Sequence, residues 1–368
     1  MTRSWMAAWP RWVGWAALGW SLAYTMLGLF WWRGGAGFPF GEVHDPSGQG
    51  VSLLENARAE TTGPVLAVVG TGGAALALFL ARSRRDRLAP VVLGWAVAGA
   101  LAVVIPDYRP LLAVVRAPML LIGAPFGWPA QVRLGQFFAL FLPWPVVNQL
   151  LFIAGGLLWA GAVLAYRRRA RGACGNCGRG RAAAGWTSPA SAARWGRWAV
   201  AVAVAVPVGY AVTRWAWALD IPFGASREGL HREAADSPGI WLAGALIATM
   251  AAGGALLTIG LVRPWGEVYP RWIPYLRGRP VRPRTAIVPA TTVALLITSA
   301  GLMSLRWLAV GRIQLHPDTW GFFVPEFFWP VWGAALGLAT LAYHLRRRGR
   351  CPHCGRPGPT SAARISRS

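Results

Sequence analysis

The four cysteines of this 368-residue sequence are its residues best suited to specific chemistry. They form two Cys-x-x-Cys pairs, Cys174 with Cys177 and Cys351 with Cys354. A thiol pair at this spacing can form a disulfide, exchange with other thiols or bind a metal ion. Both pairs follow arginine-rich segments that we expect on the cytoplasmic side of a membrane, and a reducing cytosol favours metal binding or redox chemistry over structural disulfides.

Each cysteine pair continues as Gly-Arg. A glycine at this place can adopt a positive φ, which turns backbone N–H groups toward a thiolate sulfur. The pattern resembles the knuckle of a zinc ribbon, in which two knuckles supply four sulfurs to one tetrahedral ion. We therefore expect a zinc site made of Cys174, Cys177, Cys351 and Cys354. The alternatives are a zinc site shared between two chains, thiol–disulfide chemistry, and reduced cysteines without a role.

The two pairs can meet only if the helices that precede them lie near one another. Eight residues lead from Tyr166 to Cys174, and the same number leads from Tyr343 to Cys351. An extended chain of that length reaches roughly 25 Å, whereas packed helices lie about 8–10 Å apart. A four-cysteine site within one chain is therefore geometrically feasible and would join its two halves.

Long apolar segments precede both cysteine pairs and are expected to hold them in place. Hydrophobic residues make up 55% of the chain and charged residues 14%, well below the about 25% charged residues of a soluble domain. Eight segments approach the about 20 apolar residues needed to cross a hydrocarbon core. They are residues 12–32, 64–81, 88–105, 146–166, 198–219, 240–262, 286–308 and 327–345. We expect an all-α integral membrane protein whose first segment is a retained span and not a signal peptide.

Charge predicts the orientation of these spans. The chain carries 37 basic and 13 acidic residues, a net charge of +24. Most arginines fall on the face that holds both termini, where Asp86 and Glu267 are the only acids. The positive-inside rule therefore predicts cytoplasmic N- and C-termini. Because this distribution explains the basic balance by topology and anionic headgroups, we expect the lipid bilayer, and no nucleic acid, as a partner.

A sequence repeat divides the chain into two similar parts. Residues 165–179 align with 342–356, and residues 38–41 align with 221–224. We predict a tandem duplication of a four-helix unit in which both copies share one orientation, as in parallel repeats. The expected parts are a first repeat over 1–181, a cytoplasmic linker over 182–196 and a second repeat over 197–368.

Two local features of the repeat carry further expectations. The first copy holds an insert centred on residues 117–136, which is too short to span and is expected to be interfacial or re-entrant. Gly156 and Ala160 align with Gly333 and Gly337, and small residues four apart favour close helix packing.

Ionisable and aromatic residues near the span ends receive ordinary structural interpretations. His44, Asp45, His231 and His316 are expected to be solvated loop residues, since they lack a metal-ligand spacing. Arg214 is expected to reach the membrane surface at a span end. Glu326, the counterpart of Gln149, is expected to cap a helix. The tryptophans at predicted span ends are expected to anchor the membrane interface, and they include Trp12, Trp31, Trp32, Trp144, Trp198, Trp217, Trp265 and Trp329.

The sequence favours one class of function without naming a substrate. Arginine as the sole basic residue type, with abundant alanine and glycine, is typical of GC-rich bacterial coding, so we expect the bacterial inner membrane. The leading hypothesis is a non-catalytic scaffold, sensor or accessory subunit that engages a cytoplasmic protein partner. The alternatives are a permease for a small neutral or lipophilic solute and a membrane-embedded enzyme with an outer-face site. No catalytic residue is assigned, and oligomeric state is left open.

Overall fold

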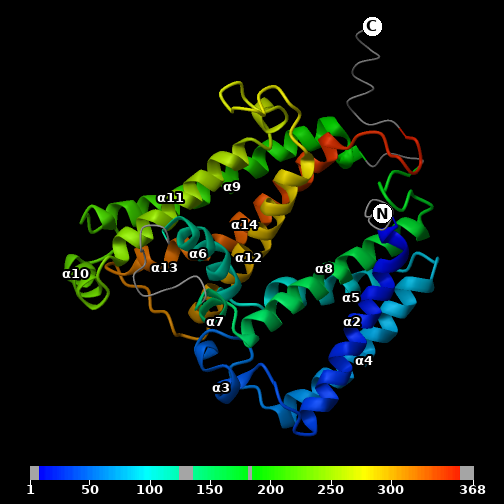
Figure 1. Cartoon of the computed structure of the whole chain (residues 1–368), viewed down its shortest axis with the longest axis horizontal. Helices are drawn as coiled ribbons and strands as arrows, with labels where there is room; N and C mark the ends of the chain where they lie inside the picture. The colour runs from blue at the N-terminus through cyan, green and yellow to red at the C-terminus, as the bar shows by residue number, and fades with distance from the viewer. Residues whose placement is uncertain (1–7, 124–135, 181–184, 357–368) are drawn as a thin grey trace. The chain divides into compact units, whose positions relative to one another are not determined.

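The computed structural model describes residues 8–123, 136–180 and 185–356, and most of the chain in these ranges is helical (Figure 1). No β-strand occurs among the described residues, and the one isolated β-bridge joins Val268 to Pro280. Within the described ranges, seven helices are long and apolar enough to cross a membrane, and a bent helix pair makes an eighth candidate if it is counted as one span. The predicted all-helical class is therefore confirmed for this part of the chain, which holds seven or eight candidate spans where eight were predicted.

Two compact units make up the chain. The first comprises residues 1–183 together with 350–357, and the second comprises 184–349 together with 358–368. The second Cys-x-x-Cys pair thus belongs to the first unit, although it follows the last helix of the second unit along the chain.

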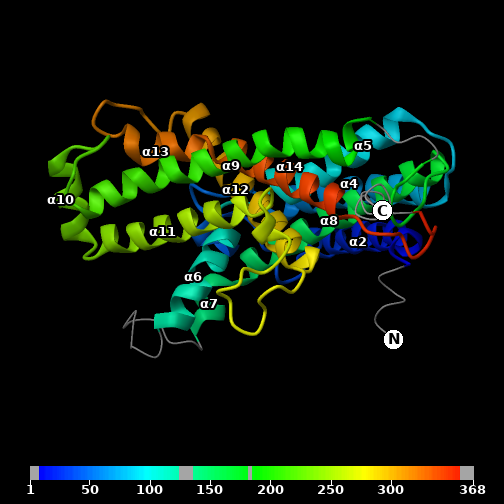
Figure 2. The ribbon, with the colours of Figure 1, turned by 90° about the horizontal axis from the view of Figure 1, so that it is seen from above.

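The first unit is built on α2, α4, α5 and α8. Its elements are α2 (Trp9–Trp32), α3 (Gly41–His44), η1 (Pro46–Gly48), α4 (Ala59–Arg82), α5 (Leu88–Gly99), the π-helical η2 (Ala100–Val104), α6 (Arg109–Gly123), α7 (Phe137–Phe141) and α8 (Trp144–Ala170). Helices α2 and α4 run side by side (Figures 1 and 2). Gly28 and Gly63 permit this approach, since a Cβ at either position would meet the backbone of the opposite helix below 3.0 Å.

The second unit is built on α9, α11, α12 and α14. Its elements are η5 (Gly185–Thr187), α9 (Pro189–Ala218), α10 (Arg227–Asp236), α11 (Ile240–Ile259), η6 (Pro264–Gly266), α12 (Pro283–Ala309), α13 (Trp320–Phe327) and α14 (Trp329–Arg347). Helix α9 packs against α11 and α14, and α14 also packs against α12. The start of α9 is encoded locally: the Ser188 hydroxyl accepts a hydrogen bond from the Ser191 N–H, and Pro189 occupies the first helical position.

The eighth candidate span is bent. Leu88–Val104 and Arg109–Ala117 meet at 57°, and Pro106 lies at the break, where a proline cannot continue the helical hydrogen bonds. The insert expected at 117–136 is described only at its two ends, in the last residues of α6 and at Gln136. Its centre, residues 124–135, lies outside the described residues, so the interfacial or re-entrant expectation stays a prediction.

Glycines make the same close contact in both units. A Cβ at Gly156 of α8 would lie 2.8 Å from the Ala98 carbonyl oxygen, and a Cβ at Gly333 of α14 would lie 2.6 Å from that of Ala294. The predicted packing role of these two glycines is confirmed. It is wrong for Gly337, where a Cβ would meet nothing within 4 Å.

Two tryptophans expected at the membrane interface belong to the cores instead. Trp31 is 1% exposed and packs edge-on against Phe38 and Phe40. Trp217 is 2% exposed and packs against Phe322. Each indole packs against the segment that follows its own helix and folds back over it. The position of a tryptophan along a predicted span does not reveal such a contact.

Candidate metal centre

The end of α8 turns the chain directly into the first cysteine pair. Gly172 adopts a φ of 60°. The Ala173 N–H donates to the Arg168 carbonyl at 2.9 Å, and the Gly172 N–H donates to the Arg169 carbonyl at 3.1 Å. These two bonds form a Schellman motif, which ends a helix with a left-handed residue. The direction in which the chain leaves α8 toward Cys174 is therefore fixed.

The two cysteine pairs have the same backbone fold. In the first, the Cys174 N–H donates to the Arg179 carbonyl at 3.1 Å, and in the second the Cys351 N–H donates to the Arg356 carbonyl at 3.1 Å. Gly178 has a φ of 72° and Gly355 a φ of 69°. The positive φ predicted for the glycine after each pair is confirmed.

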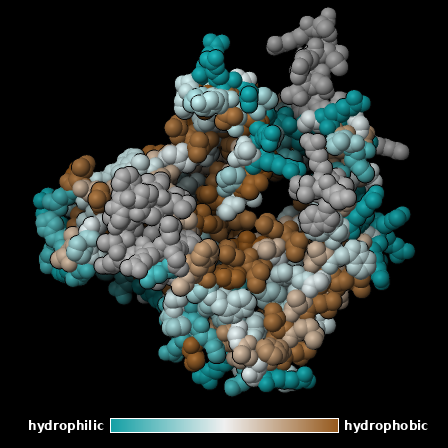
Figure 3. Space-filling model, viewed as in Figure 1, coloured by the Kyte–Doolittle hydropathy of each residue, from teal (hydrophilic) through white to brown (hydrophobic). Residues whose placement is uncertain are grey.

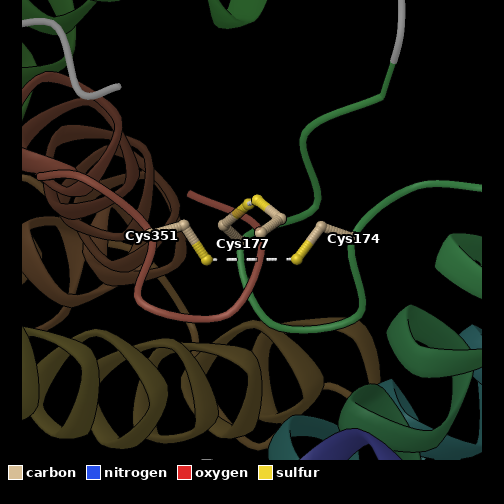
Figure 4. A group of neighbouring side chains, drawn as sticks. Cys174, Cys177 and Cys351 are labelled. Carbon is tan, nitrogen blue, oxygen red and sulfur yellow. Dashed lines mark hydrogen bonds between the residues drawn. The ribbon is translucent and has the colours of Figure 1, made fainter. Parts of the chain in front are cut away.

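The four thiols converge. All four sulfurs lie within 4.8 Å of one another. The Sγ atoms of Cys174 and Cys351 are 4.0 Å apart and point toward each other (Figure 4). Those of Cys177 and Cys354 are 3.7 Å apart. A tetrahedral zinc with Zn–S bonds of about 2.3 Å places its sulfurs about 3.8 Å apart. The cluster thus matches the donor type and spacing that a tetrahedral metal ion requires.

Backbone donors make part of the cluster acidic. Burial raises the pKa of the Cys174 thiol, but hydrogen bonds from the N–H groups of Cys177 and Asn176 and from the thiols of Cys177 and Cys354 together outweigh burial and lower the pKa to about 6. The pKa of Cys351 is likewise lowered, against burial, by N–H groups of Cys354 and His353. Burial and the neighbouring thiols raise the pKa of Cys177 to about 12, against a backbone bond from Arg179 that lowers it. A cation is therefore needed to deprotonate Cys177 near neutral pH.

Arginines brace each knuckle through its carbonyl oxygens. Arg168 donates to the Gly175 carbonyl at 2.7 Å, and its guanidinium stacks over Trp9 at 5.2 Å. Arg350 donates to the Gly355 carbonyl at 3.1 Å. With the carbonyls held by guanidinium groups, the N–H groups of the same loops remain directed at sulfur.

The helices before the knuckles are anchored by equivalent residues, which the sequence interpretation overlooked. The Tyr166 hydroxyl donates to the Arg85 carbonyl in the first unit, and the Tyr343 hydroxyl donates to the Gly266 carbonyl at 2.8 Å in the second. Each tyrosine lies eight residues before its cysteine pair. Their identity in the aligned segments was the signal that could have found them.

A second matched pair of residues completes this anchor. The Arg169 guanidinium donates to the Leu80 carbonyl at the end of α4. The Arg346 guanidinium donates to the Leu261 carbonyl, which follows α11. Each arginine lies five residues before its cysteine pair. A tyrosine and an arginine at equivalent positions thus fix the last turn of α8 in the first unit and the last turn of α14 in the second unit.

Asp45 belongs to a buried ion cluster, so its expected exposure to solvent is wrong. The Arg109 guanidinium makes two bonds to the Asp45 carboxylate, at 2.6 and 2.8 Å, and a further bond to Asp107 at 2.7 Å. The Gln149 amide donates to Asp107 at 2.7 Å. Both aspartates are less than 5% exposed. Sequence reasoning missed this cluster because Asp45 lies 64 residues before Arg109, although Asp107 is only two residues from it.

Arg214 is buried as well, and the expectation that it reaches the membrane surface is wrong. Its guanidinium lies over the rings of Tyr210 and Trp217, at 4.7 and 4.3 Å, and donates to the Gly321 carbonyl at 3.0 Å. Glu326, expected to cap a helix, lies 3.6 Å from this guanidinium and accepts a hydrogen bond from Ser304 at 3.1 Å. His231 remains exposed, as expected, beside Asp220 at 2.9 Å.

Comparison of the chain with protein-family models, with curated proteins and with solved structures gave no match. The function must therefore be inferred from the chemistry of the chain's own residues, and the cysteine cluster carries the most specific chemistry among them.

Proposed function

We propose that this chain is a multi-pass protein of the bacterial inner membrane that binds one zinc ion through Cys174, Cys177, Cys351 and Cys354. The convergence of four thiols within 4.8 Å carries the proposal. The two pairs that meet in this cluster are separated by 177 residues along the chain. Seven or eight candidate spans support the membrane location, and the arginine distribution supports a cytoplasmic metal site.

The role we propose for this site is structural. Four thiolates fill a tetrahedral zinc and leave no open position for water or substrate, which distinguishes structural from catalytic zinc. Bound zinc would hold the second cysteine pair against the first pair within the first unit. We infer a non-catalytic scaffold, sensor or accessory subunit whose metal-held cytoplasmic face binds a protein partner.

We further propose that the two units arose by duplication of a four-helix unit. Four contacts at matching positions support this: the knuckle backbone bonds, the tyrosine anchors, the arginine anchors and the close contacts of Gly156 and Gly333. Contacts of this kind are expected to persist after duplication because each fixes a helix end or a helix crossing.

Metal analysis tests the proposed site directly. The full chain, purified in detergent without chelator, should contain one zinc per chain. Cys174→Ser and Cys351→Ser should each lose it, whereas His353→Ala, which changes a neighbour outside the sulfur cluster, should retain it. Absence of metal from the wild-type protein would refute the proposal, and zinc present only in dimers would assign the site to two chains.

The proposed role has its own test. A cytoplasmic protein that co-purifies with the wild-type chain from native membranes, and is lost with Cys174→Ser, would support a metal-held scaffold. Solute flux through the purified chain in liposomes, unchanged by Cys174→Ser, would contradict it and support a permease.

A further inference from the structure

The connection between α11 and α12 is a closed loop with two different faces. Its ends are joined by the Val268–Pro280 bridge. The Tyr269 N–H donates to the Arg279 carbonyl at 3.0 Å, and the Gly278 N–H donates to the Tyr269 carbonyl at 3.0 Å. These bonds hold residues 269–279 as a projecting loop in the second unit, whose side chains are presented on a fixed backbone.

One face of this loop is a basic pocket of about 640 Å³. Its lining includes Arg271, Arg277 and Arg279. Among the described residues, no acidic group pairs with these three side chains. Glu267, the acid of this connection, lies instead 3.4 Å from Arg346 and 3.6 Å from Arg347. The pocket therefore presents three cationic groups to an anion.

The other face opens on an apolar groove of about 840 Å³ between the loop and helices α11, α12 and α14. Its lining includes Leu257, Leu261, Ile273, Val293 and Trp332. Two threonine hydroxyls in the lining are already used, because Thr258 donates to the Gly254 carbonyl and Thr285 to the Arg282 carbonyl. The groove thus suits a hydrocarbon chain, which needs no hydrogen-bond partner.

Trp272 lines both the pocket and the groove, so the two are adjacent. Trp272 is 81% exposed, and Tyr275 is 92% exposed. Tyr275 also has a φ of 63°, an unusual conformation for a residue with a side chain. Exposed tryptophan and tyrosine are enriched at the headgroup level of a bilayer. In Figure 3, hydrophilic atoms cover the projecting end of this loop and hydrophobic atoms lie directly beneath it.

We propose that this loop and groove bind one anionic phospholipid of the surrounding bilayer. The phosphate lies among Arg271, Arg277 and Arg279, and an acyl chain enters the groove past Trp272. Basic pockets at the ends of membrane helices bind anionic headgroups in this way. The proposal depends on the proposed membrane placement, and it adds a lipid-specific site to it.

Lipid binding by the purified full chain tests this site. The detergent-solubilised protein is titrated with phosphatidylglycerol or phosphatidylcholine, and bound lipid is counted by native mass spectrometry. The test variant carries Arg271→Ala, Arg277→Ala and Arg279→Ala. A matched control carries Arg84→Ala, Arg85→Ala and Arg87→Ala, which removes three exposed arginines from the α4–α5 connection of the first unit. A third variant, Ala290→Phe, fills the groove without changing charge.

We expect the wild type to bind phosphatidylglycerol at least about tenfold more tightly than phosphatidylcholine. Because an arginine near an anionic lipid contributes about fivefold in affinity, the test variant should lose most of this preference, while the arginine control should keep it. Ala290→Phe should weaken the binding of both lipids. Inorganic phosphate should not compete, since it lacks the acyl chain.

Two outcomes would overturn the lipid site. If the test variant and the arginine control lost the preference for phosphatidylglycerol equally, the lipid would be attracted by net charge and not by a site. Competition by inorganic phosphate would identify a free anion as the ligand. Failure of the chain to insert into liposomes, measured separately by flotation, would instead refute the proposed membrane function.

Discussion

Arg179 and Arg356 exchange hydrogen bonds across the cysteine cluster. Nη1 of Arg179 donates to the Arg356 carbonyl at 3.1 Å, and Nη1 of Arg356 donates to the Arg179 carbonyl at 2.6 Å. Each of these carbonyls also accepts the N–H of the first cysteine in its own pair. The backbone bond that closes one knuckle is therefore linked to the side chain of the other, which pre-organises the four sulfurs.

This exchange predicts that Arg356→Ala weakens zinc binding without removing a ligand. Loss of a group that orients metal ligands typically lowers metal affinity about 10–100-fold. Competition against a chromophoric chelator would measure the zinc affinity of the variant. Arg277→Ala, which removes an arginine from the α11–α12 loop, serves as the control and should bind zinc as the wild type does. An unchanged affinity in Arg356→Ala would show that the knuckles are held by the metal alone.

The thiol pKa values predict an order of reactivity in the zinc-free protein. Cys174, with a pKa of about 6, is mostly thiolate at pH 7, whereas Cys177, with a pKa of about 12, stays protonated. Brief alkylation at pH 7, followed by peptide mass spectrometry, should label Cys174 before Cys177. Equal labelling of both would contradict the proposed hydrogen bonding of the knuckle.

The same shift predicts the pH dependence of stability. The pKa of Cys174 lies below its ordinary value of 9.0, so the folded protein favours the thiolate. The resulting stabilisation is complete above pH 9 and is lost as the pH falls through about 6. Zinc release should follow the same direction, because protons compete for the thiolates. Metal content after equilibration from pH 8 down to pH 5 measures the release of zinc, and zinc retained at pH 5 would contradict the predicted release.

The buried ion cluster predicts a large effect at Arg109. Arg109→Ala leaves Asp45 and Asp107 buried without their cation, and removing one partner of a buried ion pair costs about 3–5 kcal/mol. The free energy of unfolding in detergent measures this loss. Arg171→Ala breaks an exposed pair with Asp86, whose side chains are 57% and 38% exposed, and should cost less than about 1 kcal/mol. Similar costs in the two variants would indicate that the Arg109 cluster is hydrated.

Three glycine-to-alanine substitutions test the helix contacts of the two units. Gly156→Ala and Gly333→Ala place a Cβ against the backbone of a neighbouring helix and should destabilise by about 1–3 kcal/mol. Gly337→Ala has open space and should be neutral or stabilise by up to about 1 kcal/mol, since alanine favours a helix over glycine. Thermal unfolding of the three variants in one detergent would rank them. A neutral Gly333→Ala would remove one of the contacts that support the duplication.

Much of the fold follows from local sequence. The third predicted span, residues 88–105, corresponds closely to α5 and η2, because continuous hydrophobicity acts over neighbouring residues. Helix ends were less well predicted: α4 begins at Ala59, five residues before the predicted start. The polar residues of its first turn can be helical outside the hydrocarbon core, which a hydropathy pattern does not record.

Local sequence is sufficient to predict the helical class, the spacing of the cysteines and the conformation of Gly178 and Gly355, since each depends on a few adjacent residues. The folded structure is needed to see that Cys174 approaches Cys351 and that Asp45 is buried against Arg109. These pairs are 177 and 64 residues apart. At such separations, a contact depends on how helices pack and not on the residues that flank it. The pattern therefore identified the chemistry of the site, and packing assembled its ligands.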